Sequence, residues 1–381
     1  MNSRERLLAA MRREPVDYVP MQVGFWPPIA PEHLRWKDER GRMETYDTLG
    51  LDKVLYLRLE YSQAPGVTSR VWQTSDPQSP YPLLHKEFQT PAGPLSAIVK
   101  RTEDWPWGED IPFLDDFSPP RYVKPWVQSV TDVERLRYVL QPPQGAVKDH
   151  LAAQARETQA LAREYGAIVA GMSGSGLDLV CWMCGFSQAV IMGVEQPKVI
   201  EKLLDLVHDL NLPGIDLLAE LGADYIDRRG WYESTDFWSP RMFAQYARPL
   251  LEAEIERTHR YGLPFLYLMV TGIMPLLPQL AELPFDVLIQ LEPALGGQDL
   301  RAITRALPGK AFLGGISAPI HLGEGTPETV RQAVRDAFDI FGHRGFILGC
   351  SASIRSYFPW ENVQALMDEW KRLRTAQGVN A

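Results

Sequence analysis

The stretch Phe265-Leu-Tyr-Leu-Met-Val-Thr-Gly-Ile-Met-Pro-Leu-Leu277 gives the clearest indication of the fold. The run from Phe265 to Val270 is apolar throughout, which is typical of a strand that is buried on both faces. Gly272 indicates a turn, and Pro275 suits the first turn of a helix. The stretch therefore predicts a strand, a short loop and a helix, which together form the repeating unit of a parallel α/β fold.

Similar units follow one another from about residue 160 onward. Short apolar runs predict strands, and the segments between them carry apolar residues at helical spacing, as in 197–221. With two earlier strands, the count is about eight, which is the number that closes a (β/α)8 TIM barrel. An open doubly wound sheet is disfavoured because no Gly-x-Gly-x-x-Gly follows an early strand. The expected strands span residues 19–23, 54–59, 167–171, 223–227, 265–270, 287–291, 311–315 and 346–349.

Residues from about 60 to 150 interrupt this pattern, because they are rich in proline and show little periodicity. Within them, residues 85–100 predict a β-hairpin that turns at 91–93. We expect one domain over residues 1–381, in which this irregular segment is an insertion that forms one wall of the barrel mouth.

Composition limits the class of protein. The chain has 381 residues, is 45% hydrophobic and 23% charged, and carries a net charge of -9 without basic runs, which disfavours nucleic acid as a partner. No apolar stretch reaches the ~20 residues of a membrane span, and the charged N-terminal segment does not resemble a signal peptide. Three cysteines argue against a disulfide framework. We expect a cytoplasmic monomer or homodimer.

Several short segments, in order, resemble the uroporphyrinogen decarboxylase superfamily. The resemblance implies a (β/α)8 barrel enzyme, either a decarboxylase or a methyltransferase of the cobamide-dependent branch. The segments that carry it are 3–20, Gly222-Ala-Asp224, Ser239-Pro240, Gly314-Gly-Ile316, Gly345-Phe-Ile-Leu-Gly349 and Glu361-Asn-Val363.

The chain departs from the decarboxylase pattern where that enzyme holds its substrate. The family's Arg-Gln-Ala-Gly-Arg motif after the first strand aligns with a segment in which Phe25 and Ile29 replace the two arginines. Trp182 stands at the position of the family's tyrosine, and Ala352 at that of its histidine. A porphyrinogen with many carboxylates needs paired cations, so this substrate is disfavoured.

The chain also departs from the zinc-dependent methyltransferases. Their His-x-Cys-Gly motif aligns with Met269 and Thr271, and a thioether and a hydroxyl are poor zinc ligands. We therefore expect no bound metal. Cys181, Cys184 and Cys350 offer three thiols, but a pair of cysteines without partner ligands at a known spacing is better interpreted as small buried hydrophobes.

The candidate catalytic residues are Asp227, Glu233 and Glu292, because the carboxyl ends of barrel strands line the active site. The run Asp227-Arg228-Arg229 fits either a structural ion-pair cluster or an anion clamp with an acid/base partner. Glu233 could protonate a leaving oxygen, or it could be a favourable charge ahead of the helix at Ser239. The candidate substrate-binding residues are Trp26, Trp182, Arg228, Arg229, Tyr232, Met269, Thr271, Ser317, Cys350 and Arg355.

Three functions remain open. The first is a zinc-independent methyltransferase in corrinoid-dependent demethylation of a small methylated substrate, with no tightly bound cofactor and with cobalamin carried by a partner corrinoid protein. Here Glu233 or Asp227 would be the acid, and Arg228 or Arg355 the anchor. The second is a decarboxylase, a lyase, that acts on a smaller acid than a porphyrinogen. The third is a non-catalytic barrel that binds a tetrapyrrole or a corrinoid protein.

Overall fold

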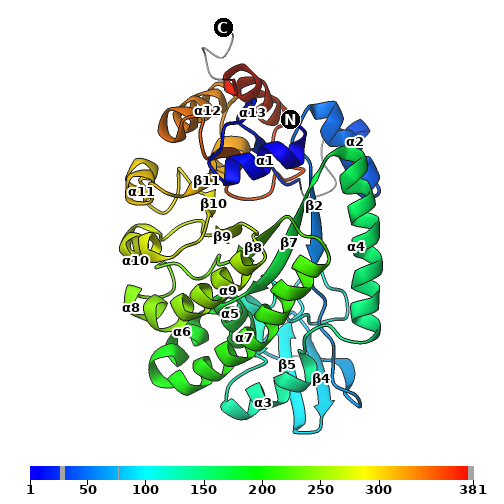
Figure 1. The fold of residues 1–381 in the computed structure, drawn as a ribbon. Coiled ribbons are helices and arrows are strands. Elements are labelled where there is room, and N and C mark those ends of the chain that lie inside the picture. The colour runs from blue at the N-terminus through cyan, green and yellow to red at the C-terminus, as the bar shows by residue number, and fades with distance from the viewer. Residues whose placement is uncertain (26–30, 76, 376–381) are drawn as a thin grey trace.

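The main sheet contains eight parallel strands that curl into a TIM-barrel-like wall with helices packed outside it (Figure 1). The computed structural model describes residues 1–25, 31–75 and 77–375. In hydrogen-bonding order the strands are β1 (Met21–Gln22), β12 (Phe346–Cys350), β11 (Ala311–Ile316), β10 (Val287–Leu291), β9 (Phe265–Leu268), β8 (Tyr225–Arg229), β7 (Ile168–Ser175) and β2 (Val54–Arg58). All eight lie within a few residues of the expected positions, which confirms the predicted fold.

The helices of the barrel follow its strands in the expected alternation. Ser239 accepts a hydrogen bond from the Met242 amide, and Thr326 caps the helix that begins at Pro327. The helices are α1 (Ser3–Met11), α2 (Glu39–Leu49), α3 (Val130–Val139), α4 (Ala146–Tyr165), α5 (Leu177–Cys184), α6 (Phe186–Glu195), α7 (Pro197–Glu220), α8 (Pro240–Met242), α9 (Arg248–Arg260), α10 (Leu277–Glu282), α11 (Leu300–Ala306), α12 (Pro327–Phe341) and α13 (Trp360–Leu373). Short helices of other types span Glu32–Leu34, Pro119–Arg121, Phe243–Ala247, Met274–Leu276 and Ala318–Glu324.

Apolar side chains fill the lower part of the barrel. Leu7 and Met11 of α1 join a buried cluster with Tyr225, Leu268 and Ile289 from the inner faces of the strands. Helix α1 therefore closes the end of the barrel at which the strands begin. One buried ion pair, Arg6 with Asp52, also lies at this end, and the candidate site residues lie at the opposite end, where the strands finish.

The barrel wall has one seam. Strand β1 pairs with β12 through Met21 and Gln22 alone, and in the described part of the chain no ladder joins β1 to β2. Such a short strand offers little edge for β2. A cavity of about 690 Å³ lies at this seam, and Tyr56 and Arg58 of β2 are among its lining residues.

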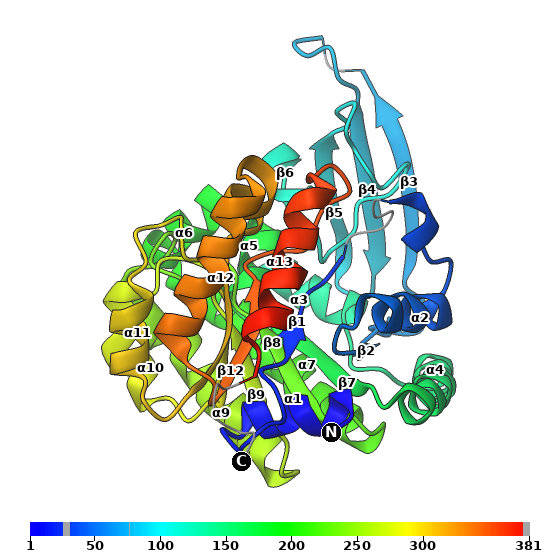
Figure 2. The same ribbon diagram turned by 90° about the horizontal axis from the view of Figure 1, so that it is seen from above.

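The segment between β2 and α4 is more regular than the sequence suggests. The predicted hairpin is confirmed as β4 (Leu83–Thr90) and β5 (Gly93–Lys100), which with β3 (Thr68–Thr74) and β6 (Tyr122–Lys124) form an antiparallel sheet beside the barrel (Figure 2). The expected irregularity is therefore corrected for the residues of this sheet, whereas the assignment of the segment as an insertion stays a prediction. Alternating burial along β5 places one face against the core, and this weak pattern was hidden among the prolines. The single-domain assignment stays a prediction.

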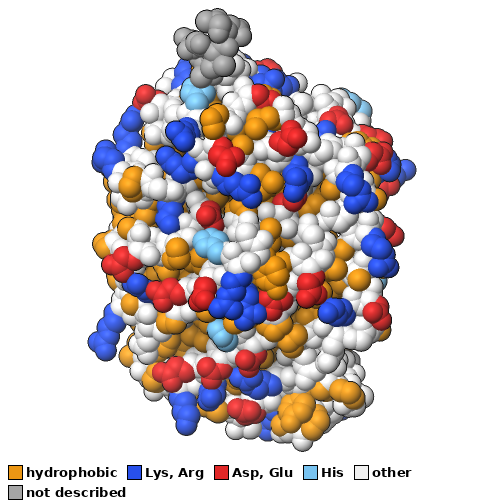
Figure 3. Space-filling model, viewed as in Figure 1, with side chains coloured by type: hydrophobic (Ala, Val, Ile, Leu, Met, Phe, Trp, Pro, Cys, Tyr) orange, Lys and Arg blue, Asp and Glu red, His pale blue; other side chains and the backbone are white. Residues whose placement is uncertain are grey.

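Basic and acidic side chains alternate over the face seen in Figure 3, without a large patch of one sign. No single described helix is long and apolar enough to cross a membrane; α5 and α6 together have the length and composition, but they are bent by 107° at their junction.

Candidate active site at the barrel mouth

Strand β8 places consecutive charged residues on opposite sides of the barrel wall. Tyr225 packs into the barrel interior, so Asp227 and Arg229, two and four residues further on, face the same side. Arg228 lies between them in the sequence and faces outward, toward α7 and α9. Because side chains of a strand point alternately to its two faces, the predicted cluster Asp227-Arg228-Arg229 is split, with Arg228 on the outer face and the other two on the inner face.

Asp227 is the candidate acid at the mouth. Asp227 is 8% exposed, and its Oδ1 atom has no hydrogen-bond partner in the part of the chain that the structure describes. Burial raises the pKa of Asp227 to about 7, although the positive charges of Arg58 and Arg229 act to lower it. A carboxyl group with this pKa can both donate and accept a proton near neutral pH.

Arg229 is held at the rim of the mouth by charge and by aromatic rings. Its Nε atom donates to Asp178 at 2.6 Å, and Nη2 donates to both oxygens of Asp116 at 3.1 and 3.3 Å. The guanidinium carbon lies 5.2–5.4 Å from the ring centroids of Trp182, Trp231 and Tyr232. These contacts fix the direction of the guanidinium, because cation–π and ion-pair geometry both constrain it.

Asp178 organises this rim from below. Its side chain is completely buried and accepts hydrogen bonds from the amides of Trp231 and Tyr232 as well as from Arg229. Burial raises the pKa of Asp178 to about 6, against the lowering effect of Arg229. The loop after β8 is therefore attached to α5 through one carboxylate.

The outer face of β8 carries a second charged group, which is closed to solvent. Arg228 is fully buried and pairs with Glu254 at 2.8 Å and with Glu233 at 3.0 Å. Glu233 also accepts from the Tyr267 hydroxyl at 2.6 Å and from the Leu177 amide at 3.0 Å. Burial lowers the pKa of Arg228, but the two glutamates outweigh it and raise the pKa overall. Glu233 and Arg228 thus lie where a ligand in the barrel interior does not reach.

A glycine makes this packing of charges feasible. A Cβ atom on Gly176 would lie 2.3 Å from both the Arg228 guanidinium and the Glu233 carboxylate. No side chain fits there, so the turn between β7 and α5 requires glycine for this close approach.

The remaining candidates at the ends of β9 to β12 occupy separate places. Glu292 is buried and accepts from the amides of Ala294 and Leu295 and from the Ser351 hydroxyl at 2.6 Å, so its charge is used within the fold. Ser317 is also buried and caps the short helix after β11. Neither lies beside Asp227 in the contacts that the structure gives.

Met269 and Cys350 face away from the barrel interior, and Thr271 forms a hydrogen bond within its own surroundings. Met269 and Cys350 are buried in clusters between the wall and the outer helices, and burial raises the pKa of Cys350 to about 12. Thr271 lies in the loop after β9 and donates to Asp236. Arg355 is half-buried in the loop after β12, and Trp26 lies outside the described residues.

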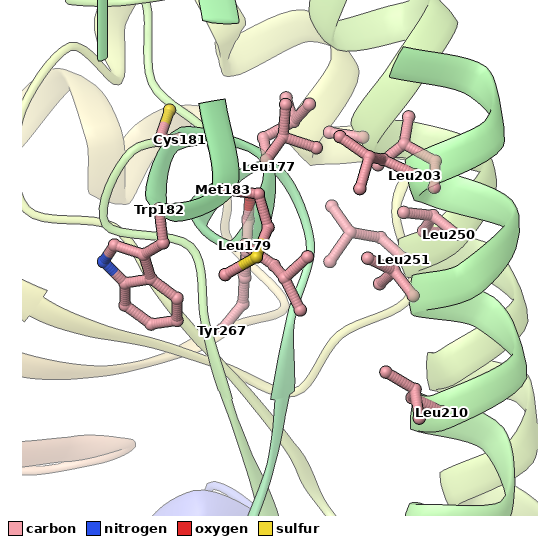
Figure 4. Close-up of a cluster of buried hydrophobic side chains, with 14 of the residues drawn as sticks. Leu177, Leu179, Cys181, Trp182, Met183, Leu203, Leu210, Leu250, Leu251 and Tyr267 are labelled. Atoms are coloured by element: carbon pink, nitrogen blue, oxygen red, sulfur yellow. The ribbon is translucent and has the colours of Figure 1, made fainter. Parts of the chain in front are cut away.

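Trp182 is one of the candidates that the structure does bring to the mouth. Figure 4 shows its indole on the opposite side of α5 from the leucines of α7 and α9. The indole Nε1 donates to Asp116 at 2.9 Å, and the Tyr232 hydroxyl donates to the same carboxylate oxygen at 2.8 Å. Trp182, Arg229 and Tyr232, three of the candidate substrate-binding residues, therefore meet at one carboxylate, and their role in binding substrate stays a prediction.

Within the described residues, no group of three or more His, Cys, Asp and Glu side chains is arranged to hold a metal ion. Cys181, Cys184 and Cys350 are free and buried. Burial raises the pKa of each thiol, which disfavours the thiolate that zinc requires.

Comparison with known proteins now adds to this geometry. A family model described as "Uroporphyrinogen decarboxylase (URO-D)" matches residues 103–373. The chain belongs to the uroporphyrinogen decarboxylase family. A comparison with curated proteins gives no match.

Two solved structures resemble this member of the uroporphyrinogen decarboxylase family. A methyltransferase from Methanosarcina mazei aligns with a TM-score of 0.56 and 17% identity over 98% of this chain and 99% of that one. A B12-independent methionine synthase from Shewanella sp. W3-18-1 aligns with a TM-score of 0.44 and 10% identity, over 60% of this chain and 65% of that one. The first likeness supports the TIM-barrel fold, and membership of the family supports an enzyme.

Sequence reasoning did not identify several residues at the mouth of this family member. Arg58 ends a correctly predicted strand, so its position was a usable signal. Asp178 lies in the first turn of α5, just after β7, so its position near a strand end was also a usable signal. Asp116 lies in the insertion, and no local pattern indicates that it contacts Arg229 across 113 positions. Gln290 has a left-handed backbone, with φ of 63°, at an irregularity in β10, which no sequence pattern reveals.

Proposed function

We propose that the protein is a zinc-independent methyltransferase that removes a methyl group from oxygen in a small substrate, with Asp227 as the general acid. The observation that carries the proposal is the buried Asp227 carboxyl, whose pKa is raised to about 7 and whose Oδ1 has no partner among the described residues. Loss of a methyl group leaves an oxygen that needs a proton. A carboxylic acid that is about half protonated near pH 7 supplies that proton effectively.

The surroundings of Asp227 suit a small, partly anionic substrate. Arg58 and Arg229 both act electrostatically on Asp227, so two guanidinium groups lie close enough to attract an anionic substituent. Apolar side chains of the barrel interior, among them Leu268 and Ile289, exclude water below. Dry surroundings strengthen each of these electrostatic interactions.

The methyl acceptor in this proposal is a cobalamin carried by a partner protein, whose cobalt would supply a nucleophile for the methyl group. The donor set of the mouth fits this arrangement, because the chain contributes carboxylates, guanidiniums and aromatic rings but no metal-holding group in its described residues. Loops at this end of the barrel or in the insertion also expose apolar side chains that suit contact with a second protein: Trp107, Leu114, Phe117, Leu295 and Tyr357. Asp227 holds and transfers the proton, and Arg229 orients the substrate.

One observation favours a second candidate, a decarboxylase of a small acid. The same two arginines, Arg58 and Arg229, could hold one carboxylate while burial near Asp227 favours loss of another as CO₂. Asp227 would then protonate the resulting carbanion. The two candidates share their acid and differ in the bond that breaks.

A paired assay tests these functions. The purified protein is mixed with reduced cobalamin and a panel of methyl ethers and methoxylated acids, while the cobalamin spectrum is followed. Parallel samples contain a panel of small di- and tricarboxylic acids and are analysed for CO₂. A spectral change that requires both protein and methyl donor supports methyl transfer. Release of CO₂ without methyl transfer would establish the decarboxylase instead, and binding without either reaction would point to a non-catalytic barrel.

A further inference from the structure

The carboxylate of Asp116 is bound by the barrel mouth in the way that an enzyme binds a carboxylate ligand. Its oxygens accept from Arg229 Nη2 at 3.1 and 3.3 Å, from Trp182 Nε1 at 2.9 Å and from the Tyr232 hydroxyl at 2.8 Å. The donors come from β8, from α5 and from the loop after β8, whereas Asp116 comes from the insertion. Convergent donors from separate elements around one planar anion are typical of carboxylate recognition.

The donors are held in place by contacts that do not involve Asp116. The buried Asp178 accepts from Arg229 Nε at 2.6 Å and from the Tyr232 amide at 2.6 Å. The rings of Trp182 and Trp231 lie 5.2 and 5.3 Å from the Arg229 guanidinium carbon. If Asp116 moved away, the guanidinium and the hydroxyl would keep their positions. A preorganised site of this kind loses little entropy when it binds a new anion.

Asp116 itself is loosely held compared with its donors. Its side chain is 48% exposed, whereas that of Arg229 is 26% exposed and that of Asp178 is fully buried. Solvent therefore reaches the carboxylate from one side, which gives an incoming anion a route of exchange.

We propose that Arg229, Trp182 and Tyr232 form a subsite for a carboxylate group of the substrate, and that Asp116 is an internal ligand which the substrate displaces. The insertion thereby covers the mouth until a carboxylate arrives. For its role in turnover this inference rests on the proposed function, because it names an acidic group on the substrate. The binding site itself is defined without reference to the reaction.

Removing the internal ligand should open the subsite to simple anions. In Asp116→Gly, acetate and benzoate no longer compete with a tethered carboxylate, so their affinity should rise at least about tenfold over the wild type. Binding is measured by calorimetry and by the rise in melting temperature at constant ionic strength, with chloride as the reference anion. The matched control is Asp104→Gly, which removes an aspartate that pairs with Arg121 in the same insertion.

Two additional variants protect the test from loss of folding. Asp116→Asn keeps a side chain of the same size and should show a smaller gain in acetate affinity than the glycine variant. Adding Arg229→Gln to Asp116→Asn should abolish that gain. Equal acetate affinity in the wild type, Asp104→Gly and both Asp116 variants would overturn the proposal. Because acetate binding involves no methyl transfer or CO₂ release, this outcome is distinct from failure of the proposed reaction.

Discussion

The two faces of strand β8 use the same residue types for different purposes. On the inner face, Asp227 and Arg229 lie at the barrel mouth, where Asp227 keeps an oxygen without a partner among the described residues. On the outer face, Arg228 is fully buried between two glutamates. The inner carboxyl has a pKa raised to about 7, while the outer guanidinium has its charge reinforced by its partners.

The difference follows from how completely each charge is satisfied. Arg228, Glu233, Glu254 and Tyr267 form a network whose members contact one another at 2.6–3.0 Å, so it is expensive to disturb. Arg228 Nη2 has no hydrogen-bond partner among the described residues, but it forms an ion pair with Glu233, so its charge is compensated. Burial removes water from the Asp227 carboxyl, and no hydrogen bond from the described residues replaces that water at Oδ1. Residues in that condition are typical of functional sites, whereas satisfied buried networks are typical of scaffolds.

The strongest test of this contrast is the variant Asp227→Asn. An amide has nearly the same shape but cannot donate an acidic proton, so methyl transfer should fall by about 10²–10⁴-fold. Turnover with a substrate from the assay above, at fixed cobalamin concentration, gives the measurement. The fold should survive, because Asp227 Oδ1 has no hydrogen-bond partner among the described residues that the substitution could remove. Activity within a factor of two of the wild type would remove Asp227 as the acid.

On the outer face, Arg228→Met should instead destabilise the fold. It leaves Glu233 and Glu254 buried without their cation, which costs about 3–5 kcal/mol in comparable cases. Chemical denaturation monitored by fluorescence measures the free energy of unfolding. The control is Arg260→Ala, which removes an exposed partner of Glu256 and should leave the stability unchanged. A normal stability for Arg228→Met would mean that the network is less important than its geometry indicates.

Stability should also depend on pH through Asp227. The folded pKa of about 7 exceeds the ordinary value of about 3.9, so the native state holds a proton that the unfolded state releases. The contribution is complete below about pH 4 and is lost as pH rises to about 7, by at most about 4 kcal/mol. The difference in unfolding free energy between wild type and Asp227→Asn should therefore change over this window. A difference that is flat with pH would contradict the raised pKa.

The sequence was sufficient to predict the barrel but not the two faces of β8. Strands such as Phe265–Leu268 are continuous apolar runs, which makes them easy to recognise and also removes the alternation that would reveal which side faces inward. Asp227 and Arg228 are adjacent in a strand, so a shift of the strand by one residue would move Arg228 to the mouth and Asp227 to the exterior. The prediction that both act together at the mouth therefore could not distinguish a chemical group from a structural one.

The contribution of the insertion was hidden for another reason. Asp116 reaches Trp182, Arg229 and Tyr232 through tertiary contacts that depend on how the antiparallel sheet packs beside the barrel. Nothing near Asp116 in the sequence reports that packing. Met269 and Cys350 illustrate the converse, since their positions at the ends of predicted strands indicated the mouth, whereas both are buried in clusters against the outer helices.

A milder change on the outer face is Tyr267→Phe. It removes the hydroxyl that donates to Glu233 at 2.6 Å and leaves the Arg228 ion pairs in place. Loss of a hydrogen bond to a charged group costs about 1.5–3 kcal/mol, less than loss of the cation. The unfolding free energy should fall accordingly while kcat is preserved. A large loss of activity with normal stability would indicate that this network takes part in the reaction.

The smallest expected effect concerns Arg58 and returns to the inner face. Burial raises the pKa of Asp227 and Arg58 opposes that rise, so Arg58→Gln should move the pKa upward. If protonated Asp227 is the acid, the decline of kcat at high pH should shift to higher pH. Saturating substrate is used because Arg58, which lines the seam cavity, would also attract an anionic substrate in the proposed function. Arg4→Gln is the control, since Arg4 pairs with Asp224, just before β8, at the opposite end of the barrel, and should leave the profile unchanged. An unshifted pH profile in Arg58→Gln would mean that the charge of Arg58 does not influence the group whose protonation controls the rate. The general acid would then be a residue other than Asp227.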